Sequence, residues 1–257
     1  MIPRIIPVLL IEHSRLVKSQ KFRKNIYVGA PINAIKVFSQ KYVDEIIICD
    51  KSKRETNAID FDLLADMSLE CFSPLTYAGG IRSESQVAKL FKIGVEKVCI
   101  NSAIRRQPWL AESLISKYGA QSIVASVDLI KIFGRYRIYR HEKKFIKYNI
   151  LPDDVLNHIR NIEEQGFGEI FINFVNRDGM YAGYDVKMIK AIAEIIKIPI
   201  TVCGGCRNYD DLFNLAKETN VSGIAAGSVF SFRSESRGVL INYPDIREIE
   251  DNLGEFF

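Results

Sequence analysis

The chain has 257 residues, of which 47% are hydrophobic and 26% are charged, and its formal net charge is +4 at pH 7. These proportions exclude a collagen-like, disordered or disulfide-scaffold protein. A charge of +4 is too weak to indicate a nucleic-acid partner. No apolar run approaches the roughly 18 residues of a membrane-spanning helix, and the first residues lack a signal-peptide pattern. We therefore expect a cytoplasmic protein without a membrane partner.

Short apolar runs alternate with amphipathic segments along the whole chain. The predicted strands are Ile5–Ile11, Glu45–Asp50, Leu75–Ala78, Lys97–Asn101, Ile123–Asp128, Glu169–Phe174, Ile200–Cys203 and Gly223–Ala226. The predicted helices are Pro31–Gln40, Ile59–Glu70, Glu84–Ile93, Pro108–Tyr118, Pro152–Gln165, Val186–Ile196, Tyr209–Glu218 and Asp245–Asn252. Continuously apolar strands suit a parallel sheet buried on both faces. Eight such units without a linker predict one α/β domain over residues 1–257, a (βα)8 TIM barrel, with an open doubly wound sheet as the alternative.

Residues Phe133–Tyr148 interrupt this alternation after the fifth strand. Aromatic and basic side chains alternate there, which predicts an inserted β-hairpin. Between Lys131 and Lys147, seven basic residues stand against one acidic residue, Glu142. The segment is therefore either a solvated hairpin or a contact for an anionic ligand or an acidic partner.

The two halves of the chain resemble each other. The segment Pro74–Arg82, with Gly79-Gly80, matches Pro199–Arg207, with Gly204-Gly205, and the next units, Lys97–Ala103 and Gly223–Val229, also match. An internal match at half the chain length predicts two fused half-barrels.

Both halves place small and polar residues at the carboxyl ends of strands, where (βα)8 barrels build their sites. Glycines let the backbone approach an oxyanion, and N–H groups at the following helices can bind phosphate. The candidate residues are Gly79, Gly80, Asn101 and Ser102 in one half, and Gly204, Gly205, Gly227 and Ser228 in the other. Two opposed sites predict a phosphorylated or nucleotide-linked ligand with two phosphates.

Three aspartates also follow predicted strands, namely Asp50, Asp128 and Asp178, the last before Gly179. A carboxylate at a barrel mouth can act as a general acid or base, and we assign that role to Asp128. Asp50 and Asp178 either cap helices or bind ligand hydroxyl groups.

Four charged residues lie at strand starts, at the opposite end of the barrel: Arg4, Glu45, Lys97 and Glu169. Two cations and two anions there can neutralise one another and close the axis. Such a cluster is either a stability feature of the bottom face or a gate for a small neutral molecule.

The cysteines and histidines indicate no cofactor or metal. An odd count of five cysteines is typical of a reducing compartment. Cys203 and Cys206 form a C-x-x-C pattern without a second ligand pair, which favours a glycine-rich turn over a zinc or redox site. His13, His141 and His158 have no metal-ligand spacing.

Together, several motifs resemble the cyclase subunit family of imidazole glycerol phosphate synthase. They are Arg4-Ile-Ile-Pro-Val-Leu, Ala78-Gly-Gly-Ile-Arg82, Lys97-Val-Cys-Ile-Asn-Ser102, Asn176-Arg-Asp-Gly179, Gly183-Tyr-Asp185 and Ala226-Gly-Ser228. The resemblance implies a two-half (βα)8 lyase with a glutaminase partner on its N-terminal face. Ammonia from that partner passes a charged gate and the barrel interior to a two-phosphate substrate.

The resemblance also implies residue roles. Arg4, Glu45, Lys97 and Glu169 match the gate positions, and Asp128 matches one of two catalytic aspartates. Positions that contact substrate or phosphate match Gly80, Asn101, Ser102, Asp178, Gly205 and Ser228, and Lys18 matches the lysine of a mobile first loop.

Two positions depart from the family pattern. Leu10 stands where the other catalytic aspartate is expected, and Ser19 replaces a glycine. The Pro-x-Leu-Leu segment resembles paralogues of surface-polysaccharide biosynthesis, in which ammonia serves a sugar amidotransferase that forms an acetamidino group. The three hypotheses are that ammonia-channelling subunit, a true histidine-pathway cyclase, and a non-catalytic binding module that docks through Lys131–Lys147.

Overall fold

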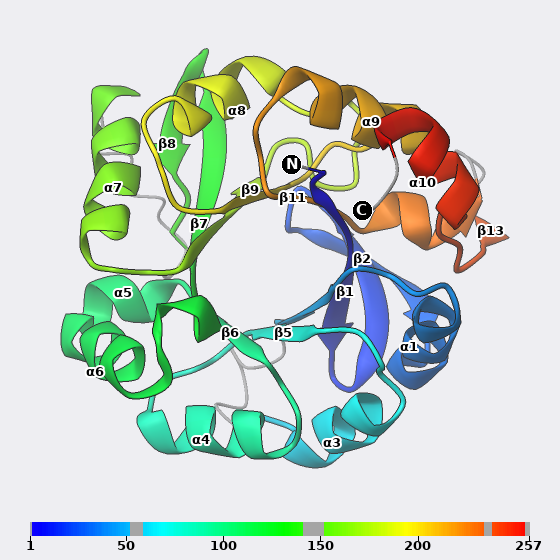
Figure 1. Cartoon of the computed structure of the whole chain (residues 1–257), viewed down its shortest axis with the longest axis horizontal. Helices are drawn as coiled ribbons and strands as arrows, with labels where there is room; N and C mark the ends of the chain where they lie inside the picture. The colour runs from blue at the N-terminus through cyan, green and yellow to red at the C-terminus, as the bar shows by residue number, and fades with distance from the viewer. Residues whose placement is uncertain (1, 52–58, 141–151, 234–237, 255–257) are drawn as a thin grey trace.

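The computed structural model describes residues 2–51, 59–140, 152–233 and 238–254. Eight parallel strands form its centre, in the order β1 (Arg4–Glu12), β4 (Ile46–Asp50), β5 (Leu75–Ala78), β6 (Lys97–Ile100), β7 (Ile123–Ile132), β9 (Glu169–Phe174), β10 (Ile200–Cys203) and β11 (Gly223–Ala226). Pairing of β11 with β1, from Arg4↔Gly223 to Pro7↔Ala226, closes the sheet. Figure 1 looks down the resulting barrel. The predicted (βα)8 barrel is confirmed, and the open sheet is wrong.

Helices surround the barrel (Figure 1). They are α1 (Pro31–Gln40), α3 (Phe61–Leu69), α4 (Glu84–Lys92), α5 (Ser102–Arg106), α6 (Pro108–Tyr118), α7 (Pro152–Glu164), α8 (Val186–Ala193), α9 (Tyr209–Glu218) and α10 (Ile246–Leu253), with 3-10 turns η1 (Ala120–Ser122) and η2 (Ser228–Phe230). Side-chain caps fix several starts: Ser83 forms a capping box with Gln86, and Asp60 accepts from the Leu63 N–H. The short α5 was not predicted. Among the described helices, none has the length and apolar character needed to cross a bilayer.

The apolar side chains form two separate layers. Most lie between strands and helices, where Ile5, Leu9 and Phe38 are fully buried. A smaller cluster fills the inside of the barrel and contains Ile6, Val8, Ile47, Cys99, Val124, Phe171 and Ala225. The barrel interior is therefore a packed apolar layer, as expected for a barrel of eight strands.

The first strand of each half continues into an antiparallel hairpin. β7 runs four residues past Asp128 and pairs with β8 (Arg135–Ile138), so the predicted hairpin begins earlier than Phe133. Its predicted residues 141–148 lie outside the described part of the chain. β1 pairs with β2 (Arg15–Gln20), which pairs with β3 (Lys24–Gly29), and this second hairpin was not predicted. A further two-stranded pair joins β12 (Phe232–Arg233) to β13 (Gly238–Val239).

A close backbone approach where β9 begins gives a test of this packing. A Cβ at Gly168 would lie 2.2 Å from the carbonyl oxygen of Ala120, whereas a Cβ at Gly29 would meet no atom within 4 Å. We expect Gly168→Ala to lower the free energy of unfolding by about 1–3 kcal/mol, because the backbone must shift. Gly29→Ala, as the control, should change it by less than about 0.5 kcal/mol. Urea unfolding of both variants measures the difference, and equal stabilities would contradict the described packing.

Candidate functional site

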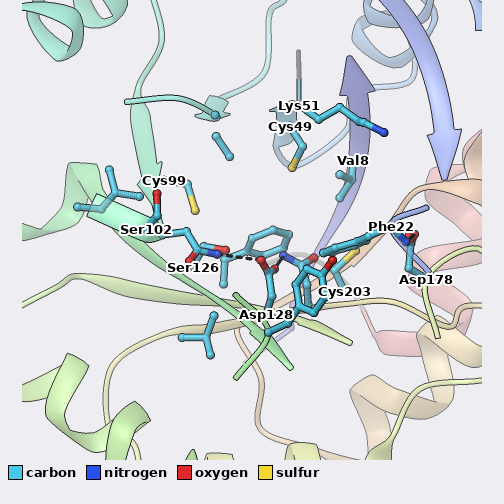
Figure 2. A pocket seen from close by; sticks show the side chains of 18 of the residues that line it. Val8, Phe22, Cys49, Lys51, Cys99, Ser102, Ser126, Asp128, Asp178 and Cys203 are labelled. Carbon is cyan, nitrogen blue, oxygen red and sulfur yellow. Dashed lines mark hydrogen bonds between the residues drawn. The ribbon is translucent and has the colours of Figure 1, made fainter. Parts of the chain in front are cut away.

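A cavity of about 1120 Å³ opens at the carboxyl ends of the strands. Figure 2 shows Asp128 pointing into it, with Ser102 and Asp178 on opposite sides. The residues predicted for the site all line this cavity: Lys18, Asp50, Gly80, Asn101, Ser102, Asp128, Asp178, Gly179, Gly205, Gly227 and Ser228. The structure thus brings both predicted half-sites to one space, which is large enough for a ligand that spans them.

The glycine turn of the second half is required by its geometry. Gly205 has a φ of +115°, and a Cβ there would lie 2.1 Å from the carbonyl oxygen of Gly183. A side chain at this position is therefore excluded by both the backbone conformation and the contact. The turn therefore places backbone without a side chain at the cavity wall, which suits the close approach of an anion.

Asp128 is held by two amides at the end of β7. Its carboxylate accepts hydrogen bonds from the side-chain amides of Asn101 and Asn173, both at 2.9 Å, and the residue is 4% exposed. Two donors from the flanking strands β6 and β9 fix the orientation of the carboxylate toward the cavity. Sequence reasoning did not select Asn173, although its period-2 position in β9 places it inside the barrel mouth.

Leu10 lines the same cavity from β1. In the parallel register, Leu10 pairs with Cys49 of β4, whereas Asp128 pairs with Asn173 of β9. The half that has an aspartate thus has an amide donor on the next strand, and the half that has leucine has a thiol there. Since leucine and a buried thiol offer little for proton transfer, the two halves of the rim differ in chemistry.

Lys18 extends from β2 into the barrel mouth. Its ammonium group donates to the carbonyl oxygen of Val8, and the residue is 5% exposed. Burial lowers the pKa of Lys18 to about 8, despite the neighbouring Asp178. Gly227 leaves room for it, because a Cβ there would lie 2.9 Å from the lysine nitrogen. Lys18 is therefore poised to carry or release a proton at the cavity wall near neutral pH.

Asp178 joins the first hairpin to the loop after β9. Its carboxylate accepts from the Ser19 hydroxyl at 2.6 Å and from the Phe22 N–H at 3.2 Å. Burial raises the pKa of Asp178 above its usual value. Asp50 accepts instead from the Tyr77 hydroxyl at 3.3 Å. The helix-capping interpretation of Asp178 is wrong, because Asp185 caps α8, the helix that follows. Asp60 caps α3, but residues 52–58, between Asp50 and α3, lie outside the described part of the chain, so the interpretation of Asp50 stays a prediction.

At the opposite end of the barrel, the four charged side chains form a closed ring. Arg4 contacts Glu45 and lies 2.7 Å from Glu169, while Lys97 lies 3.0 Å from Glu45 and 3.1 Å from Glu169. Signs alternate around the axis, so each charge has two opposite neighbours. The hydroxyls of Thr76 and Thr201 donate to Glu45 and Glu169, each at 2.5 Å. The ring thus closes the strand-start end of the axis.

The ring fixes the charge state of Glu169. Burial raises the pKa of this carboxyl, but the charges of Arg4 and Lys97 and the hydrogen bonds from Arg4 and Thr201 outweigh it, so the pKa lies below its usual value. The glutamates are almost fully covered, whereas the Arg4 and Lys97 side chains remain 27% and 21% exposed. Solvent therefore reaches the ring from the cation side.

Other side chains of interest fall into two groups. Cys203 and Cys206 are free, burial raises the pKa of both thiols, and the described residues contain no cluster that could hold a metal ion. His158, which the sequence analysis did not select, lines the cavity from α7 together with Arg140. Its helical position faces the barrel, and that register was the only available signal.

The lowered pKa of Glu169 predicts a pH-dependent contribution to stability. A carboxyl whose folded pKa is depressed stabilises the fold above its unfolded pKa of about 4.5 and loses that contribution as the pH falls through the folded pKa. We expect Glu169→Gln to cost about 1–3 kcal/mol at pH 7 and progressively less below pH 4.5. Denaturant unfolding at several pH values, with Glu218→Gln at an exposed ion pair as the control, measures this. A pH-independent difference would contradict the assignment.

The sequence matches the family model described as histidine biosynthesis protein over residues 4–236. The chain is 39% identical over 249 residues to "Putative imidazole glycerol phosphate synthase subunit hisF2" of Pseudomonas aeruginosa, covering 96% of this chain and 98% of that protein. It is 38% identical over 251 residues to "Putative imidazole glycerol phosphate synthase subunit HisF" of Leptospira interrogans, covering 96% of this chain and 97% of that protein. The similarity spans both half-barrels, the ring and the cavity. The chain therefore belongs to the histidine biosynthesis protein family.

Proposed function

We propose that this chain is the synthase-type subunit of a glutamine amidotransferase system. It receives ammonia from a glutaminase subunit and channels it through the barrel, for acetamidino-sugar formation by a sugar amidotransferase in surface-polysaccharide biosynthesis. One observation carries the proposal: the charged ring is complete at one end of the barrel, while Leu10 lines the cavity at the other end, at the position where the resemblance implies a carboxylate. The proposed ammonia entrance thus has all four charges, whereas the cavity has fewer groups that can transfer protons.

The interior of the barrel suits ammonia and excludes ammonium. Above the ring lies the apolar layer that includes Val8, Cys99 and Phe171, and these three side chains also line the floor of the cavity. An unpaired cation in such a layer is strongly disfavoured, whereas a small neutral molecule is not. The barrel therefore selects the uncharged, nucleophilic form of the nitrogen donor.

Lys97 is the member of the ring that can move aside. Arg4 is fixed by Glu45 and Glu169 and by a hydrogen bond to the carbonyl oxygen of Ser222 at 3.3 Å. Among the described residues, the Lys97 ammonium is held by its two ion pairs, with Glu45 and Glu169, and lysine has a flexible four-carbon stem. Movement of Lys97 away from the axis would open the ring and leave Arg4 to hold both glutamates.

The face around the ring carries exposed apolar side chains. Tyr42, Leu69 and Phe72 are 87%, 79% and 86% exposed; Tyr42 and Phe72 lie in the loops before β4 and β5, and Leu69 ends α3. The Ser39 hydroxyl ties these loops together, since it donates to the Glu70 carbonyl and accepts from the Phe72 N–H. Large exposed apolar groups mark interaction surfaces. We assign this patch to the glutaminase subunit.

The docking assignment predicts the effect of a single charge. Phe72→Asp should weaken binding of the glutaminase subunit at least about 30-fold, because central aromatic residues of interfaces contribute about 2 kcal/mol or more. Phe133→Asp is the matched control, since Phe133 is 99% exposed at the tip of the β7–β8 hairpin on the opposite face. Calorimetric titration measures both affinities. An equal loss in the two variants would overturn the docking surface.

A second candidate function is the histidine-pathway cyclase itself. The names of the relatives favour it, and so does Asp128, whose two amide partners keep it oriented. A reaction that uses two carboxylates for cyclisation and lyase cleavage would then need Asp128 and a second carboxylate from a position other than Leu10. Loss of one general acid or base typically costs about 10²–10⁴-fold in rate.

An assay with the histidine-pathway precursor separates the two functions. Chain and glutaminase together should form imidazole glycerol phosphate at least about 100-fold more slowly than a two-carboxylate cyclase would. Asp128→Asn should then lower the remaining rate very little. Rapid turnover that Asp128→Asn abolishes would refute the proposed function and establish the second candidate.

A further inference from the structure

One wall of the cavity is basic. Its described side chains come from three places that adjoin in the barrel (Figure 1): Arg82 after β5, Arg105 and Arg106 at the end of α5, and Arg140 and His158 from the β8–α7 side. The carboxylates that line the cavity, Asp50, Asp128 and Asp178, each accept hydrogen bonds from neighbours within the barrel mouth. The basic side chains thus line the same ligand space as these hydrogen-bonded carboxylates.

The members of this wall repel one another. Burial lowers the pKa of His158, and the charge of Arg140 lowers it further. The pKa of Arg105 is lowered by burial and by the charges of Arg140 and Arg106. These four groups therefore lie close enough for their charges to interact. A multiply charged anion at the wall would relieve the repulsion.

The second half-barrel lacks these charges. Ser102 and Ser228 are matched by the internal repeat, so the residues three and four positions later can be compared. In the first half they are Arg105 and Arg106, both exposed, and in the second half they are Ser231 and Phe232, both buried. The two ends of the cavity therefore differ in charge, although the segments that contain Ser102 and Ser228 match in sequence.

A second repeat pair shows the same asymmetry. Arg82 and Arg207 follow the two glycine turns, and each has its N–H bonded to the side chain four residues later. That residue is neutral Gln86 in the first half and Asp211 in the second, where the guanidinium of Arg207 lies 2.7 Å from the carboxylate. Arg82 lines the cavity, whereas Arg207 is not among its lining residues.

We propose that the first-half end of the cavity binds a diphosphate group, and that the second-half end, at Gly205 and Ser228, binds a single phosphate or an uncharged end. Arginine forks bind phosphate oxygens bidentately, and two linked phosphates present more anionic oxygens than one. This inference deepens the proposed function and rests on it, because it names the class of ligand held in the cavity toward which the ammonia is channelled. The substrate class is a diphosphate ester.

Inorganic pyrophosphate and inorganic phosphate are the probes, titrated calorimetrically into the full-length chain at one ionic strength. Pyrophosphate should bind at least about tenfold more tightly than phosphate. The double variant Arg105→Gln, Arg106→Gln should lose at least about tenfold in pyrophosphate affinity and less than about threefold in phosphate affinity. Arg207→Gln, the matched control in the other half, should change pyrophosphate affinity by less than about twofold.

The histidines give a readout at the wall itself. The chain has only three, so the His158 signal can be assigned in NMR spectra by His158→Gln. Pyrophosphate should raise the pKa of His158 in the wild type and less so in the double variant. Uridine diphosphate distinguishes the sources: affinity at least equal to that of pyrophosphate indicates a nucleotide carrier, and weaker binding indicates a diphosphate on another alcohol.

The proposal is overturned if pyrophosphate binds no more tightly than phosphate, or if Arg207→Gln weakens it as much as the double variant. Circular dichroism checks that the variants fold, which is expected because the three arginines are exposed. Failure here would leave glutaminase docking and the ring untouched, because those act at the opposite face. Failure of this inference can therefore be distinguished from failure of the proposed function.

Discussion

The pairing of β1 with β11 is the constraint on which the rest of the molecule depends. Without it, the eight strands would form an open sheet, and their starts and ends would not converge on an axis. Closure places Arg4 beside Gly223 and brings it within reach of Glu169, far away in the sequence, while the β1–β4 pairing brings it to Glu45. The same closure gathers the carboxyl ends around one cavity. Electrostatics at one end and ligand binding at the other are thus consequences of one register.

The strand starts and the strand ends of the barrel differ in how closely their two halves match. At the strand starts, charges alternate and threonine hydroxyls complete the glutamate hydrogen bonds, so the ring is fully satisfied. At the strand ends, each half has kept its glycine turn, but the chemistry beside the turns has diverged. One half presents Asp128 with two amide donors, and the other presents Leu10 beside a thiol. Such divergence is possible because the barrel tolerates change at its loops and rim far more readily than in its packed interior.

Much of this could be predicted from the sequence, for physical reasons. β5, β9, β10 and β11 have the predicted bounds, because strands covered on both faces are short apolar runs with sharp ends. The ring could be predicted in the same way, since charges at strand starts must meet when the strands close.

The hairpins were harder to predict. The β2–β3 hairpin lies in a polar segment where Lys18 and Ser19 are buried only through contacts with distant residues, Val8 and Asp178. The contribution of His158 and of Arg105 to the cavity wall likewise depends on how helices pack around the barrel. The local sequence pattern does not encode such long-range contacts, so these residues could be assigned to the site only from the three-dimensional structure.

The two hairpins meet across the cavity wall, and this contact bears on how long a ligand stays. Phe22 of the first hairpin and Tyr139, just past β8, pack edge to face with ring centroids 5.9 Å apart, and both line the cavity. A contact of this kind contributes about 0.5–1.5 kcal/mol. If the rings must part before a ligand departs, its residence time lengthens by roughly two- to tenfold. The Phe22–Tyr139 contact between the half-barrels would then slow the dissociation of a ligand from the cavity.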